Sequence, residues 1–149
     1  MVDGRMKDFI ILGTIDKYYK KYAFKQFKNG EFRLGYSKRG GGKPLEFRYR
    51  TGEILKVSNA CWYTTFPSYV PKPMELTEEY SPEKYPEYDN YEAINCDRSR
   101  DVPKDYNGVV GVPISFVQFL NPEQFEIVGE LSPMLNGKHL YRRLLIRRK

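Results

Sequence analysis

Histidine and cysteine are scarce in this sequence, which holds one His and two Cys among 149 residues. No CxxC or HxxxH spacing occurs, so the common zinc and redox motifs are excluded. A Cys–His dyad would need Cys61 or Cys96 beside His139, and no local signature supports that pairing. We expect His139 to lie exposed in a turn and both cysteines to be free thiols.

Long apolar runs are also absent near the start of the chain, where the longest is Phe9–Leu12. Such a run is too short for a signal-peptide core or a membrane span. We therefore expect a cytoplasmic protein without membrane association, in which the cysteines stay reduced. The length fits a single domain over residues 1–149.

Charge is strongly segregated along the chain. Residues 1–60 hold 14 Lys and Arg against 6 Asp and Glu, whereas residues 61–131 hold 5 against 13. Residues 132–149 hold 6 basic residues and no acid. The basic ends favour a polyanionic partner, or they pair with the acidic middle inside the fold. The sequence leaves both interpretations open.

The first third of the chain has the pattern of a βαβ unit. Residues 8–14 (DFIILGT) form an apolar run typical of a buried strand in a parallel sheet. Residues 15–29 then follow at helical period, with Thr14 as the expected N-cap and Gly30 as the expected stop. A second strand is predicted over residues 31–37, parallel to the first.

An antiparallel hairpin is predicted next, from residues 45–50 and 54–65, and it closes a segment over residues 1–66. In EFRYR, Phe47 and Tyr49 point to one face while Arg48 and Arg50 point to the other. Residues 67–112 are expected to be irregular, because they are acidic, rich in tyrosine and poor in aliphatic side chains. Within them, residues 92–96 are a candidate short strand.

Residues 113–149 are predicted to hold a helix and the closing strands. Pro113 suits the first position of the helix, and Asn121-Pro122 ends it. Strands are predicted over residues 125–128 and 140–147, and Asn136-Gly137 is a turn signal before the last of them.

Two glycine-containing motifs resemble functional loops but lack the required side chains. In GGGK at 40–43, Lys43 is followed by Pro44 instead of the Ser or Thr that a phosphate loop uses on Mg²⁺. In GVVGVPISF, Val112 and Ile114 stand where an adenine-binding Asn-Pro-Pro-Phe loop has a polar residue and a proline. We interpret the first as a basic hairpin loop and the second as a turn into a helix. The acids of residues 75–105 are interpreted as a solvated face that complements the basic ends.

Several stretches together carry a family resemblance. They are YPEYDNYEAINCDRSRDVPKDYNGVVGVPISF at 85–116, NPEQFEIVGE at 121–130, LNGKHLYRRLLIRRK at 135–149, GYS at 35–37 and NACWYTTF at 59–66. In these stretches the chain resembles the EcoRI-type family of adenine-specific DNA methyltransferases, over roughly residues 8–149.

The resemblance implies a Rossmann-like enzyme that transfers a methyl group from S-adenosylmethionine to N6 of a flipped adenine, in a restriction-modification type system. The sequence holds neither the glycine-rich cofactor loop nor the Asn-Pro-Pro-Phe-like loop, which in the family precede the strand that residues 8–14 resemble. We therefore expect the C-terminal half of an α/β methyltransferase sheet: one βαβ, an antiparallel hairpin and an irregular acidic and aromatic segment. No catalytic or cofactor-binding residue is assigned, and whether the chain is an enzyme stays open.

DNA is the expected partner. The candidate contacts are the cations of the hairpin region and two arginines of the segment that most resembles the family: Lys38, Arg39, Lys43, Arg48, Arg50, Arg98 and Arg100. A separate N-terminal catalytic chain, or self-association through an exposed sheet edge, is a further expectation. The alternative is a stand-alone DNA-binding or protein-interaction module derived from such an enzyme.

Overall fold

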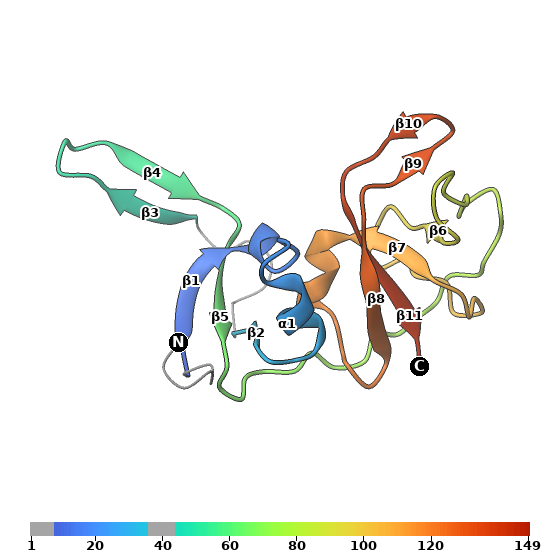
Figure 1. The fold of residues 1–149 in the computed structure, drawn as a ribbon, viewed down its shortest axis with the longest axis horizontal. Coiled ribbons are helices and arrows are strands. Elements are labelled where there is room, and N and C mark those ends of the chain that lie inside the picture. Colours follow the sequence, from blue (N-terminus) through green and yellow to red (C-terminus); the bar gives the residue numbers. More distant parts are fainter. Residues whose placement is uncertain (1–7, 36–43) are drawn as a thin grey trace. The chain divides into compact units, whose positions relative to one another are not determined.

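The computed structural model describes residues 8–35 and 44–149, and these residues are mostly β (Figure 1). They contain four small sheets, one α-helix and two 3₁₀ turns. The chain divides into two compact units, Met1–Tyr69 and Val70–Lys149. The expected α/β class is therefore wrong in its helical part, and the described residues show no clear Rossmann βαβ unit.

The first unit contains a three-stranded sheet in the order β1 (Ile10–Thr14), β5 (Ala60–Thr64) and β2 (Arg33–Leu34). β5 pairs antiparallel with both neighbours, with Ile10 opposite Thr64 on one side and Arg33 opposite Thr64 on the other. The predicted parallel pairing of β1 with β2 is wrong because β5 lies between them. The two strands nevertheless run in the same direction, since both oppose β5.

The predicted helix over residues 15–29 forms only at its two ends, as a 3₁₀ turn at Ile15–Lys17 (η1) and a short helix at Phe24–Lys28 (α1). Aromatic side chains lose rotamer freedom in a helix, and a helix of this length is marginal without tertiary packing. The turns between the two pieces instead bury Tyr18. Gly30 ends α1 with φ +74°, as predicted.

Aromatic rings form the core of the first unit and cover one face of its sheet. Phe27 lies 4.8 Å from Tyr18 and 5.4 Å from Phe32, measured between ring centroids. Phe32 in turn lies 5.9 Å from Tyr63 of β5, whose hydroxyl donates to the Thr14 carbonyl at 2.8 Å. Edge and tilted ring contacts at these distances stabilise a core beyond the area they bury.

The predicted hairpin is confirmed as β3 (Leu45–Arg48) and β4 (Ile54–Val57), which form a two-stranded sheet of their own (Figure 1). Gly52 closes the turn with φ +88°, and the Tyr49 amide donates to the Glu53 carbonyl at 2.9 Å. The predicted strand over 54–65 is divided at residues 58–59, so that its second half becomes β5 of the other sheet.

The second unit contains a four-stranded sheet in the order β6 (Ile94–Asn95), β7 (Val110–Pro113), β11 (Arg143–Arg148) and β8 (Phe125–Leu131). β6 and β7 are parallel, and the other pairs are antiparallel. The predicted strands over 92–96, 125–128 and 140–147 are all present with shifted ends.

The segment after Pro113 is a 3₁₀ turn at Ile114–Gln118 (η2) in place of the predicted longer helix. The predicted turn at Asn136-Gly137 is confirmed, since both residues have positive φ. It joins β9 (Met134–Leu135) to β10 (Lys138–His139).

Residues 70–93 contain no helix or strand, and side chains hold them in place. The side-chain amide of Gln124 bonds to the backbone of Met74 in the way a neighbouring strand would. Its Oε1 accepts from the Met74 backbone N–H and its Nε2 donates to the Met74 carbonyl, each at 2.7 Å. Asn121 Nδ2 donates to the Pro71 carbonyl at 2.7 Å. Tyr85 is fully buried and donates to the Asp101 carbonyl at 2.6 Å. Specific hydrogen bonds thus replace regular pairing in this segment.

Candidate nucleic-acid interface

The predicted DNA contacts divide between the two units of the chain. Three of them lie outside the described residues: Lys38, Arg39 and Lys43. Arg48 and Arg50 lie in the β3–β4 hairpin of the first unit, and Arg98 and Arg100 follow β6 in the second. The latter four side chains are exposed to solvent.

Arg48 lies in β3 directly opposite Ile54 of β4, and Arg50 lies in the turn that joins the two strands. Among the described residues, no carboxylate forms an ion pair with either guanidinium. Lys56 on the same face is paired with Glu46 at 3.1 Å. The hairpin therefore presents two arginines whose charges are available to an anion.

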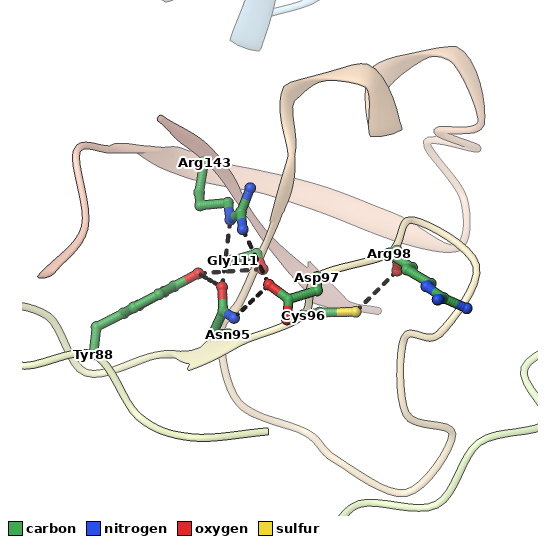
Figure 2. A network of polar contacts seen from close by, with 7 residues as sticks. All are labelled: Tyr88, Asn95, Cys96, Asp97, Arg98, Gly111 and Arg143. Carbon is green, nitrogen blue, oxygen red and sulfur yellow. Dashed lines mark hydrogen bonds and ion pairs between the residues drawn. The ribbon is translucent and has the colours of Figure 1, made fainter. Parts of the chain in front are cut away.

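A polar network that runs from buried Tyr88 and Asn95 to the exposed Asp97 precedes Arg98 in the chain (Figure 2). The Tyr88 hydroxyl donates to Asn95 Oδ1 at 2.8 Å, and Asn95 Nδ2 donates to Asp97 Oδ1 at 2.9 Å. Arg143 of β11 donates to the same two oxygens, at 3.3 Å and 3.2 Å. Burial raises the pKa of Tyr88 to about 12, so its hydroxyl still donates above pH 10, where an exposed tyrosine loses its proton.

The backbone after β6 is fixed by two donors to one carbonyl. Cys96 Sγ and the Asp101 amide approach the Arg98 carbonyl oxygen at 3.1 Å and 3.0 Å. The Arg100 guanidinium lies 6.0 Å from the centroid of the Phe119 ring, at the limit of a cation–π contact. This turn therefore presents both arginines from a defined backbone.

The sequence did not predict the network of Tyr88, Asn95, Asp97 and Arg143. One signal was present: Asn95 is a polar residue between Ile94 and Cys96, in a strand whose neighbours are buried. A buried amide needs hydrogen-bond partners, which are here supplied by side chains distant in sequence.

Among the described residues, three of the six cations of the basic C-terminal segment form ion pairs with acids of the middle segment. Arg142 pairs with Glu130, Arg143 with Asp97, and Arg147 with Glu126. Arg148 donates to the Asn107 side chain and the Lys104 carbonyl. At this end of the chain, the ion pairs of Arg142, Arg143 and Arg147 agree with the internal-pairing interpretation of the charge segregation.

The described residues offer no constellation for nucleophilic or metal chemistry. Cys61 and Cys96 are buried, and burial raises the pKa of Cys96 to about 11. His139 is exposed in β10, and no group of three potential metal ligands occurs in the described ranges. Phe116 is fully buried with its ring 5.5 Å from Phe125, so it cannot stack on a base. The stretch predicted as a turn into a helix is the end of β7 followed by the 3₁₀ turn η2.

Comparisons with known proteins agree with the resemblance seen in the sequence. The chain is 33% identical over 165 residues to type II methyltransferase M.EcoRI of Escherichia coli, and the alignment covers 96% of this chain and 51% of that protein. It is 27% identical over 143 residues to M.MgeORF184P of Mycoplasma genitalium and to M.MpnI of Mycoplasma pneumoniae, covering 85% of this chain and 45% of each.

The chain thus spans about half the length of the curated relatives it matches. No solved structure gives a significant match. Within residues 8–35 and 44–149, no helix is long and apolar enough to cross a membrane. A family profile described as adenine-specific methyltransferase EcoRI matches residues 3–149, and the chain therefore belongs to the EcoRI family of adenine-specific methyltransferases.

Proposed function

We propose that the chain is the C-terminal, DNA-recognising part of an adenine-N6 DNA methyltransferase and that it completes the catalytic sheet without catalysing the reaction alone. Membership of the family and the coverage of about half of each relative support this proposal. A region of such an enzyme without catalytic groups contributes by binding the duplex and by packing against the cofactor-binding part. The sequence also lacks an Asn-Pro-Pro-Phe-like loop.

The observation that carries the sheet-completing role is the state of β1. This apolar strand has the composition of a buried strand, yet Ile10 is 63% exposed and Ile11 53% exposed. β5 covers only one of its edges, so the backbone groups on the other edge have no strand partner among the described residues. Leu12 and Trp62 lie opposite each other on the uncovered face and are exposed as well. A neighbouring strand and a covering layer would bury this surface.

S-adenosylmethionine is the methyl donor that the family implies, and the described residues do not fit it. The loop after β1 is where a cofactor-binding strand would carry its glycine turn. Gly13, the glycine nearest that loop, lies within β1, and a Cβ on it would lie 3.1 Å from the Tyr63 ring, so the backbone there is packed tightly against protein. The helical segment that follows is a three-residue 3₁₀ turn, too short to present a helix N-terminus to the cofactor. The cofactor site is therefore assigned to the part of the enzyme outside this chain.

Titration of the purified chain with S-adenosylmethionine in a calorimeter tests the division of roles. No heat of binding is expected, and a micromolar dissociation constant would show that the cofactor site lies within this chain. A parallel measurement follows the fluorescence anisotropy of a labelled duplex. Binding is expected at low salt, with log K falling by about 0.9 per phosphate contact for each tenfold rise in salt. Absence of any duplex binding at low salt would contradict the DNA-recognising role.

A further inference from the structure

The β3–β4 hairpin has two chemically different faces, and its register assigns them. Residues directly opposite each other in an antiparallel pair project to the same face. Leu45 faces Val57 and Phe47 faces Leu55, which makes one face apolar. The other face is polar apart from one residue, and it consists of two cross-strand pairs: Glu46 with Lys56 and Arg48 with Ile54.

The hairpin is also the most exposed regular element of the first unit. All its strand residues except Val57 are exposed, and within residues 8–35 and 44–149 each strand pairs only with the other. A single two-stranded hairpin is marginally stable in water. Packing against a partner would add stability to such an element.

We propose that the polar face of the β3–β4 hairpin lies in the major groove of duplex DNA, where Arg48 contacts a base edge and so determines part of the sequence preference. This inference rests on the proposed DNA-recognising function and adds to it the recognising element and groove. The dimensions agree, because strands about 4.8 Å apart with their side chains fill a groove about 12 Å wide.

The chemistry of the polar face suits base edges better than it suits the phosphate backbone alone. Arginine pairs with the O6 and N7 acceptors of guanine, and an apolar side chain contacts the thymine methyl group. Arg48 and Ile54 lie directly opposite each other and offer these two groups side by side. The Glu46–Lys56 pair leaves Arg48 without a carboxylate partner on the face, while Arg50 at the tip is placed for a backbone phosphate.

The apolar face does not provide the same function, because Leu45, Phe47 and Leu55 have no hydrogen-bonding side chains. Its placement on the base edges would leave their donors and acceptors unpaired, which is costly once water is excluded. The polar face is therefore the one assigned to the groove.

The test is a selection of binding duplexes from a random-sequence pool, carried out with the wild-type chain and with R48A. The wild type is expected to enrich a preferred sequence. R48A is expected to lose the preference for guanine at one position and to bind the selected duplex about tenfold or more weakly, with binding to unselected duplex changed less than about twofold. R33A removes an exposed arginine of β2 in the same unit and is the matched control. It is expected to retain the wild-type preference.

A second arm addresses the groove. Replacing guanine by 7-deazaguanine in the selected duplex removes the N7 acceptor, which faces the major groove. The wild type should bind this duplex more weakly than the parent duplex, whereas R48A should not distinguish the two. F47S on the opposite face should behave as the wild type, and circular dichroism verifies that each variant is folded.

The outcomes separate the inference from the function on which it rests. If R48A selects the wild-type sequence, or if F47S and not R48A loses the preference, the assignment of the polar face is wrong. Equal binding of every duplex by the wild type would overturn base recognition by the hairpin while leaving DNA binding intact. If the wild type binds no duplex at low salt, the proposed function is wrong together with the inference.

Discussion

Gly111 of β7 provides the sharpest test of the packing that supports the segment after β6. It lies opposite Leu145, and the ring of Tyr88 covers the position of its missing side chain. A Cβ there would lie 2.6 Å from Tyr88 Cε2 and 2.7 Å from Cζ, closer than carbon atoms can pack. The ring must therefore move in G111A, and its hydrogen bond to Asn95 is lost with it.

The cost follows from these two effects. Overpacking a close-packed core costs about 1–3 kcal/mol, and the lost hydrogen bond adds about 1 kcal/mol. We therefore expect G111A to lower the free energy of unfolding by about 2–4 kcal/mol. For a unit of this size that corresponds to a fall in Tm of roughly 10 °C or more.

Gly129 of β8 is the matched control, because it lies opposite the same Leu145 from the other side of β11. A Cβ at Gly129 would meet only Leu145 Cδ1, at an ordinary 3.8 Å. G129A should therefore be neutral or stabilise the chain by up to about 1 kcal/mol. Urea unfolding followed by circular dichroism measures both variants. If G111A and G129A have the same stability within about 0.5 kcal/mol, the reasoning from Tyr88 is refuted.

Three further predictions concern buried polar groups. Burial raises the pKa of Tyr88 to about 12 and also raises the pKa of Tyr63. Because the unfolded state loses these protons first, the free energy of unfolding should fall as the pH rises above about 10. A free energy of unfolding that stays constant between about pH 9 and 11.5 in denaturant titrations would contradict this. Cys61 and Cys96 are buried with raised pKa values, so a chromogenic disulfide reagent at pH 8 should modify them slowly in the folded chain and rapidly in urea. N121A removes hydrogen bonds to three backbone groups and should lower the free energy of unfolding by about 2 kcal/mol, measured by thermal unfolding. An unchanged free energy of unfolding would show that water replaces these bonds.

Local patterns in the sequence predicted the strands better than the helices. Alternation in EFRYR led to a hairpin that is present, and the Asn136-Gly137 signal led to a turn that is present, because turn chemistry and pleat geometry act over a few residues. The short strands β9 and β10 on either side of that turn were not predicted. The prediction of one continuous helix over 15–29 was wrong because its apolar spacing came from aromatic residues such as Tyr18. Tyr18 is buried, but it lies in a turn and not in a helix. Periodicity does not distinguish these two ways of burying a ring.

Long-range contacts account for most of what the sequence did not reveal. The insertion of β5 between β1 and β2 depends on pairing across about fifty residues, and no local signal specifies it. The Asn95 and Arg143 contact likewise joins residues 48 positions apart. Alternation in EFRYR had already placed Arg48 on the face opposite Phe47, but the cross-strand partners Ile54 and Leu55 became known only from the register of β3 and β4.

The open edge of β1 also has a consequence for the behaviour of the chain in solution. The segment FIILGT carries no charge and no proline, and charged Asp8 and Asp16 flank it only at its ends. An open, apolar strand edge of this kind is a template for intermolecular β-pairing, which becomes faster as the chain becomes more concentrated. Solubility of this chain is therefore expected to depend on its concentration and on how soon after synthesis a partner strand reaches that edge.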